Sequence, residues 1–143
     1  MKGDLLPDED DISRYCKTTA MGSDNLPLSN AFEPRSHDDH LSVNWLQYFN
    51  LGSVELAIDS VREAFTEMGF GLAEGGRFAV LNVGLAKAAV LDGSEVKISI
   101  LHWPDDDLDP SHSGIFGFDA NDLKVAVELK GLVSKDQIYS ARA

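Results

Sequence analysis

Residues 78–102, FAVLNVGLAKAAVLDGSEVKISILH, contain the pattern on which the predicted fold depends. A strand-like run at 78–83 and an alternating run at 94–102 flank the pair Asp92-Gly93. An Asp-Gly pair is typical of the two-residue turn between antiparallel strands, because that turn needs positive φ angles. The segment therefore predicts a long β-hairpin over about 78–102. The alternative is a short helix over residues 85–91, which are rich in alanine.

Two further segments, one before and one after the expected hairpin, predict helices. Residues 53–68 have apolar residues at helical spacing, Ser53 in position to cap the N-terminus and Gly69 in position to end the helix. Residues 119–133 carry a second apolar stripe, with Asp119 as a candidate cap. No helix connects strands at the spacing of a parallel crossover. We therefore expect an α+β fold, a small and mainly antiparallel sheet packed by these two helices.

The length of 143 residues fits one domain. Residues 1–11 predict a flexible acidic lead, and residues 12–143 a single globular α+β domain. Ile12 opens a short strand-like run, and residues 41–46 predict a strand that runs into a helical turn. Residues 18–40 are polar and irregular, with Phe32 as the expected anchor to the core.

The composition is strongly acidic, with 24 acidic against 12 basic residues and a net charge of -12. This balance argues against binding to nucleic acid or to an anionic membrane, since both require cationic side chains. It permits cationic partners such as a basic protein, a basic peptide or a metal ion, and the simpler interpretation is that the charge keeps the protein soluble. Cys16 is the single cysteine, so an intramolecular disulfide and a cysteine-based zinc site are excluded. Without a secretory signal or a long apolar run, we expect a cytoplasmic protein.

Histidine and aspartate gather in residues 102–114, directly after the second arm of the expected hairpin. His102 and His112 are candidate ligands for a divalent metal such as zinc, with Asp107 or Asp109 completing or orienting the site. The alternative, which we favour, is that both histidines have structural roles at strand ends and turns.

Calcium binding in the manner of an EF-hand is disfavoured, although Asp105, Asp107 and Asp109 alternate as such a loop begins. Counted from Asp105, the position that needs glycine holds Pro110, and the position that needs glutamate holds Phe116.

Weaker candidates lie nearer the N-terminus. Residues 37–40, His-Asp-Asp-His, could join a metal site with His102 and His112, although a plain polar loop is the favoured interpretation. Cys16 could act as a nucleophile with His112, assisted by Arg14, but a small buried thiol is the favoured alternative. Arg14 and Arg35 could each bind a carboxylate or phosphate, or close an internal ion pair, which we consider the better interpretation.

Three phrases of the sequence, Ser13-Arg14-Tyr15-Cys16, residues 41–46 (LSVNWL) and residues 111–115 (SHSGI), resemble small bacterial proteins that are themselves uncharacterised. The resemblance covers most of the chain. It implies a bacterial cytosolic protein, and it brings no activity, cofactor or catalytic role.

Two hypotheses of function follow from the sequence. The leading one is a small acidic binding or regulatory protein that docks a protein partner, since the charge is high and no motif with a known mechanism is present. The alternative is a small metal-dependent or Cys/His hydrolase-type enzyme that uses the loop between His102 and His112. The sequence does not decide whether the protein is an enzyme.

Overall fold

The computed structural model describes residues 2–142 and contains one six-stranded sheet in the order β4-β5-β2-β1-β3-β6. Every neighbouring pair of strands is antiparallel. This confirms the predicted α+β class. The strands are β1 (Asp11–Cys16), β2 (His40–Trp45), β3 (Arg77–Asn82), β4 (Ser99–His102), β5 (His112–Phe116) and β6 (Ile138–Ser140).

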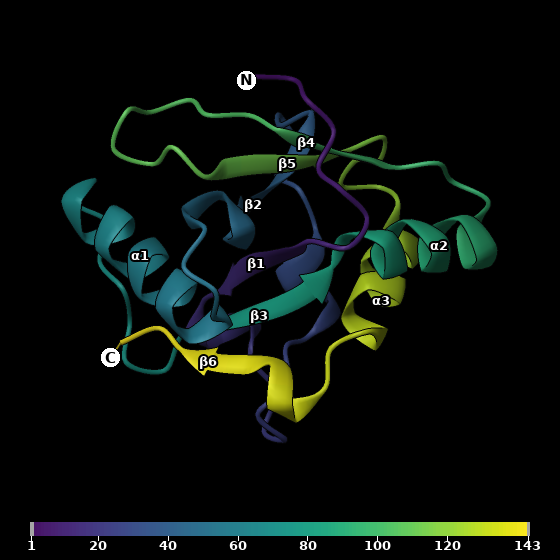
Figure 1. Ribbon diagram of the computed structural model, residues 1–143. Coiled ribbons are helices and arrows are strands. Elements are labelled where there is room, and N and C mark those ends of the chain that lie inside the picture. Colours follow the sequence, from purple (N-terminus) through teal and green to yellow (C-terminus); the bar gives the residue numbers. More distant parts are fainter. Residues whose placement is uncertain (1, 143) are drawn as a thin grey trace.

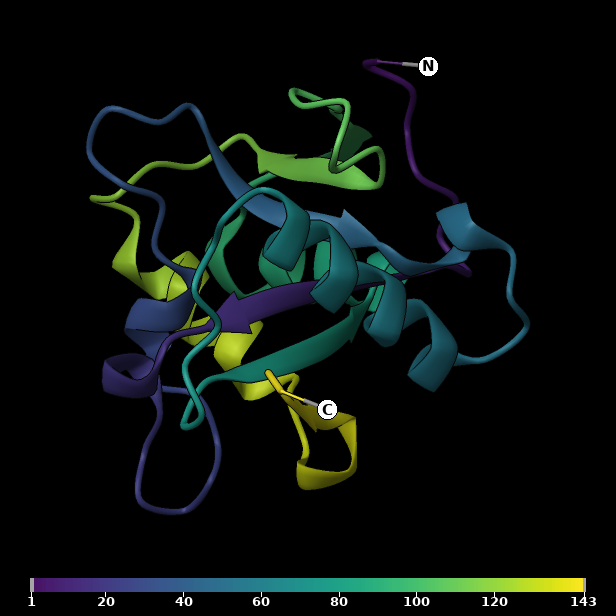
Figure 2. The same ribbon diagram turned by 90° about the vertical axis from the view of Figure 1, so that its left-hand side faces the viewer.

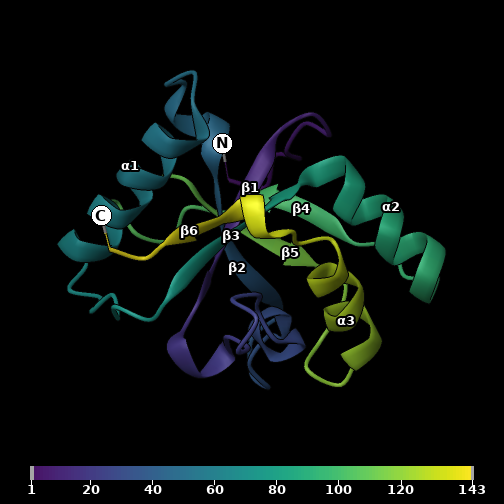
Figure 3. The same ribbon diagram turned by 90° about the horizontal axis from the view of Figure 1, so that it is seen from below.

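Three α-helices cover the sheet on two sides (Figures 1 and 3). Helix α1 (Val54–Glu67) lies on one face, where Ile58 and Val61 pack against Phe78 and Val80 of β3. Helices α2 (Val83–Ser94) and α3 (Leu123–Gly131) lie on the other face, over the larger core. Figure 2 views the molecule from the α1 side, with that helix in front of the strands.

Local sequence signals placed several elements correctly. Helix α1 begins after Ser53, whose side chain accepts a hydrogen bond from the backbone N–H of Leu56, as expected for an N-cap. Strands β1 and β2 overlap the expected runs, each beginning one residue earlier, and β2 continues into a short 3₁₀ helix at Leu46–Phe49. Helix α3 is shorter than the expected 119–133, because its N-cap is Asp122 and Asp119 instead closes a turn with Asn121.

The expected hairpin over 78–102 was wrong, because residues 83–94 form α2 and Asp92-Gly93 lies in its last turn. Asn82 caps this helix by accepting a hydrogen bond from the N–H of Leu85. The helix buries Val83, Ala86 and Val90, which recur at helical spacing, whereas Leu85 is 62% exposed. Helix capping and alanine-rich composition therefore outweighed the turn preference of one dipeptide.

The acidic N-terminal segment lies along the free edge of β4. Backbone hydrogen bonds join Gly3 and Leu6 to His102 and Ile100, and the side chain of Leu6 is buried. The irregular excursion over residues 18–40 contains two 3₁₀ turns, Thr18–Ala20 and Ser29–Phe32. Phe32 is fully buried and anchors the excursion, as expected from the sequence. Among the described residues, no helix is long and apolar enough to cross a membrane.

Candidate functional site

The β2–β5 ladder places two histidines on one face of the sheet. His40 lies opposite Phe116, and Asn44 lies opposite His112. Opposite residues and alternate residues along each strand share a face, so His40 and His112 lie on the same side although they are distant in sequence. This is the α1 side, because Asn44 also lies opposite Ser13 of β1, which is paired with Val80 of the core beneath α1.

Gly114 provides the space that lets these histidines meet. A Cβ atom at Gly114 would lie 2.7 Å from Cδ2 of His40 and 2.8 Å from the ring of Phe116. Since glycine has no side chain, the His40 ring stacks on Phe116, with centroids 4.8 Å apart, and extends over Gly114 toward His112. The centroids of the two imidazoles are 5.9 Å apart.

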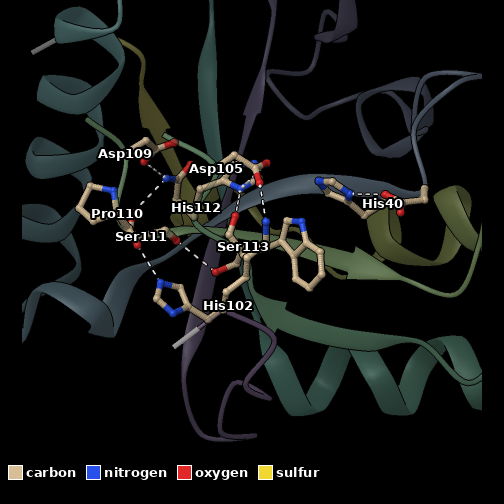
Figure 4. Close-up of polar contacts among 12 residues, drawn as sticks. His40, His102, Asp105, Asp109, Pro110, Ser111, His112 and Ser113 are labelled. Carbon is tan, nitrogen blue, oxygen red and sulfur yellow. Dashed lines mark hydrogen bonds and ion pairs between the residues drawn. The ribbon is translucent and has the colours of Figure 1, made fainter. Parts of the chain in front are cut away.

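Asp105, from the loop between β4 and β5, completes a cluster with both histidines. One ligand atom from each of His40, Asp105 and His112 lies within 4.8 Å of the other two. The His40 and His112 side chains are each 15% exposed, and the Asp105 side chain is 51% exposed. Figure 4 shows the His40 ring reaching across the strands toward Asp105 and His112. The cluster is therefore a possible metal centre that remains open to solvent on the Asp105 side.

Hydrogen bonds orient both imidazoles through the same ring atom. Nδ1 of His40 lies 2.7 Å from a carboxylate oxygen of Asp39, and Nδ1 of His112 lies 2.6 Å from the carbonyl oxygen of Trp103. Both oxygens only accept hydrogen bonds, so Nδ1 of each neutral ring carries the proton. Nε2 of each ring then keeps its lone pair. Metal-binding histidines in proteins are oriented in this way by a carboxylate or a backbone carbonyl.

A buried polar network holds the loop that carries Asp105 against β2. The side-chain amide of Asn44 donates to Oδ1 of Asp109 at 2.8 Å and to the hydroxyl of Ser111 at 2.9 Å. Burial raises the pKa of the Asp109 carboxyl above its usual range. Asp109 is 4% exposed and therefore acts as a loop anchor. Asp107, by contrast, is exposed on the same loop.

The structure does not bring His102 and His112 together. His102 lies opposite Ser113, so it shares a face with Ser113, and the adjacent His112 points to the other face. Nε2 of His102 lies 2.7 Å from the carbonyl oxygen of Pro110, and the ring packs on Trp45. The geometry thus supports the structural role of His102 that the sequence favours. Of the expected partners of His112, Asp109 lies near it as a buried loop anchor, whereas His102 faces the other side of the sheet and Asp107 is exposed.

Cys16 is also separated from His112 by the sheet. Cys16 alternates with Ile12 on the α2–α3 side, whereas Ser13, opposite Asn44, lies on the side of His112. The thiol is fully buried, and burial raises its pKa to about 11. The expected nucleophilic pair is therefore not assembled in this structure.

We expect Cys16 to be inert toward a thiol reagent in the folded protein. At pH 8 a thiol with a pKa of about 11 is almost entirely protonated, and the buried sulfur is out of reach of solvent. Reaction with 5,5′-dithiobis(2-nitrobenzoate) should be negligible in buffer and complete in denaturant. Rapid modification of the native protein at a rate matching free cysteine would contradict this description.

The sequence indicates every member of the cluster, but not as one set of three. It offers His40 as a possible partner of His102 and His112 in a metal site, with a polar loop as the favoured alternative, and Asp105 as a disfavoured calcium ligand. Alternation along β2 could have placed His40 on the same face as Asn44. The pairing of β2 with β5 cannot be derived in this way, because the two strands are far apart in the sequence.

Comparisons of the chain with family models, with curated proteins and with solved structures found no significant match.

Proposed function

We propose that this protein binds one divalent transition-metal ion, such as zinc, at His40, Asp105 and His112, and uses the open coordination positions to activate water as a small metal-dependent hydrolase-type enzyme. The observation that carries the proposal is the convergence of one ligand atom from each of these three side chains to within 4.8 Å. Nδ1 of each imidazole is held by a hydrogen-bond acceptor, and a carboxylate oxygen of Asp105 lies 3.7 Å from Nδ1 of His112.

The donor set suits zinc. Two imidazoles and one carboxylate are a known ligand combination of catalytic zinc sites, which keep a further position for water or substrate. Ligand atoms about 2.0–2.2 Å from a tetrahedral zinc lie roughly 3.3 Å from one another. The separations, which are at most 4.8 Å, would therefore contract by up to about 1.5 Å on binding. The half-exposed Asp105 side chain has the freedom to make most of that movement.

The charge of the protein supports the same proposal. A net charge of -12 attracts cations to the surface and raises their local concentration. The same charge is the basis of the leading sequence hypothesis, a binding or regulatory protein with a basic protein partner. That hypothesis stays a prediction, and the metal centre is preferred because specific side chains converge there.

Replacing a ligand is expected to remove zinc binding. Wild-type protein, stripped with a chelator and titrated with zinc by calorimetry, should bind one equivalent. His40→Ala and His112→Ala should each lose this binding, because a pair of remaining ligands holds zinc weakly. Asp105→Asn should weaken it by at least about tenfold, since it removes the anionic ligand.

His37→Ala is the matched control. His37 belongs to the same histidine-rich loop, but its side chain is 71% exposed and pairs with Asp38 outside the cluster. It should bind zinc like the wild type. If all three histidine variants bind zinc equally well, the assignment of the centre is refuted.

A further inference from the structure

A second site lies where β1 and β2 separate. The two strands pair at only two positions, Ile12 with Trp45 and Ser13 with Asn44, and then diverge. The divergence opens a pocket of about 370 Å³. Pockets for small organic molecules have volumes of roughly 300–1,000 Å³, so this one suits a small ligand.

Arg14 occupies the gap between the two strands. Its Nε donates to the carbonyl of Ala31 at 2.7 Å and its Nη1 to the carbonyl of Ser42 at 2.8 Å. Within residues 2–142, no carboxylate forms an ion pair with Arg14, contrary to the internal pairing favoured from the sequence. A guanidinium has five N–H donors, so the pocket-lining side chain keeps donors for a ligand.

The pocket is cationic in a protein that is otherwise strongly acidic. Arg14, Lys17 and Arg35 line it, against the single carboxylate of Glu33. Burial of the Arg14 guanidinium lowers its pKa, and the neighbouring positive charge of Arg35 lowers it further. Arg35 bonds to Asp38 at 2.9 Å, and its side chain is 75% exposed at the rim. A cleft of one sign concentrates ligands of the opposite sign, here anions.

An aromatic wall faces this cationic end. Tyr15, Phe65 and Phe70 line the pocket from the α1 side. Their rings pack edge to face, with the Tyr15 centroid 5.9 Å from that of Phe65 and 5.3 Å from that of Phe70. Phe70 is 47% exposed, although it is a large apolar side chain. This wall suits the apolar body of a ligand whose anionic group meets Arg14.

We propose that the pocket between β1 and β2 binds a small organic carboxylate with an aromatic or apolar body, its carboxylate held by Arg14. The site is distinct from the metal centre, although His112 contributes to the lining of the pocket and to the metal cluster. Anion binding uses the guanidinium and therefore needs no metal.

The test is a calorimetric or NMR titration of the full chain with 3-phenylpropanoate in the presence of EDTA. We expect saturable binding of one equivalent. 3-Phenylpropylamine, which lacks the carboxylate, and inorganic phosphate, which lacks the apolar body, should each bind at least about tenfold more weakly. Equal binding of the amine would overturn the charge argument. Equal binding of phosphate would overturn the role of the aromatic wall, and absence of saturable binding would overturn the proposal.

Variants assign the binding to this pocket. Arg14→Lys keeps the positive charge but loses the planar guanidinium, whose paired N–H groups match a carboxylate. It should weaken 3-phenylpropanoate binding about tenfold or more. Because Arg14 also bonds two backbone carbonyls, Lys17→Gln on the exposed rim serves as a second variant that leaves the fold intact, and it too should weaken binding. Lys124→Gln, exposed on α3, is the control and should bind normally.

The two proposals fail separately. His40→Ala should lose zinc and keep 3-phenylpropanoate binding, whereas Arg14→Lys should bind 3-phenylpropanoate more weakly and keep zinc. If 3-phenylpropanoate binds only when zinc is present, the independent carboxylate pocket is refuted while the metal centre stands.

Discussion

Replacing Gly114 with valine is expected to abolish zinc binding while the sheet remains folded. A Cβ at this position would lie 2.7 Å from His40 Cδ2, which is closer than nonbonded carbon atoms approach. The His40 ring must therefore leave its place on Phe116 and move away from His112. Valine suits an extended strand, so the ladder between β2 and β5 can persist. Zinc calorimetry and circular dichroism on the same sample measure the two effects.

Gly131→Ala is the control for this substitution. An added Cβ at Gly131, at the end of α3, has no neighbour within 4 Å. Zinc binding should be unchanged, and stability should change by less than about 1 kcal/mol. If Gly114→Val binds zinc as tightly as the wild type, then His40 does not need its present position, and the described centre is not the binding site.

The second large effect is expected on stability. Phe32 is fully buried, and it packs in the larger core from an otherwise irregular segment. Phe32→Ala removes most of a large apolar side chain and leaves a cavity, which costs about 3–5 kcal/mol of unfolding free energy. Denaturant unfolding followed by circular dichroism measures this difference.

Leu85→Ala on α2 is the comparison for Phe32→Ala, because Leu85 is 62% exposed. Its cost should stay within about 0.5 kcal/mol, the usual range for a surface substitution. A Phe32→Ala cost as small as that of Leu85→Ala would mean that the excursion over residues 18–40 is not anchored as described.

Local signals in the sequence were sufficient for elements whose ends and faces depend on near neighbours. Ser53 predicted the start of α1, and the apolar spacing after it predicted the buried face. The same kind of reasoning failed at Asp92-Gly93, where two local preferences competed. The capping of α2 by Asn82 and the burial of Val83, Ala86 and Val90 against the sheet settled the competition in favour of a helix.

The candidate site was harder to predict because it depends on contacts between distant segments. The sequence indicates His112 as a candidate ligand and offers residues 37–40 as a weak source of partners, but it does not show that His40 and Asp105 both lie beside it. The pairing of β2 with β5 brings His40 to the same face, and Gly114 leaves room for its ring. Arg14 likewise is a candidate from the sequence, but only the structure shows that its guanidinium bonds backbone carbonyls and pairs with no carboxylate within residues 2–142.

The most direct test of the central claim is X-ray absorption at the zinc edge of the zinc-loaded protein. We expect low-coordinate zinc with two imidazole nitrogens at about 2.0–2.1 Å, a carboxylate oxygen and no sulfur. The imidazole scattering should disappear or fall in His40→Ala and His112→Ala, and it should persist in His37→Ala. A spectrum with oxygen ligands alone, without imidazole scattering, would contradict the assignment of His40, Asp105 and His112 as a metal centre.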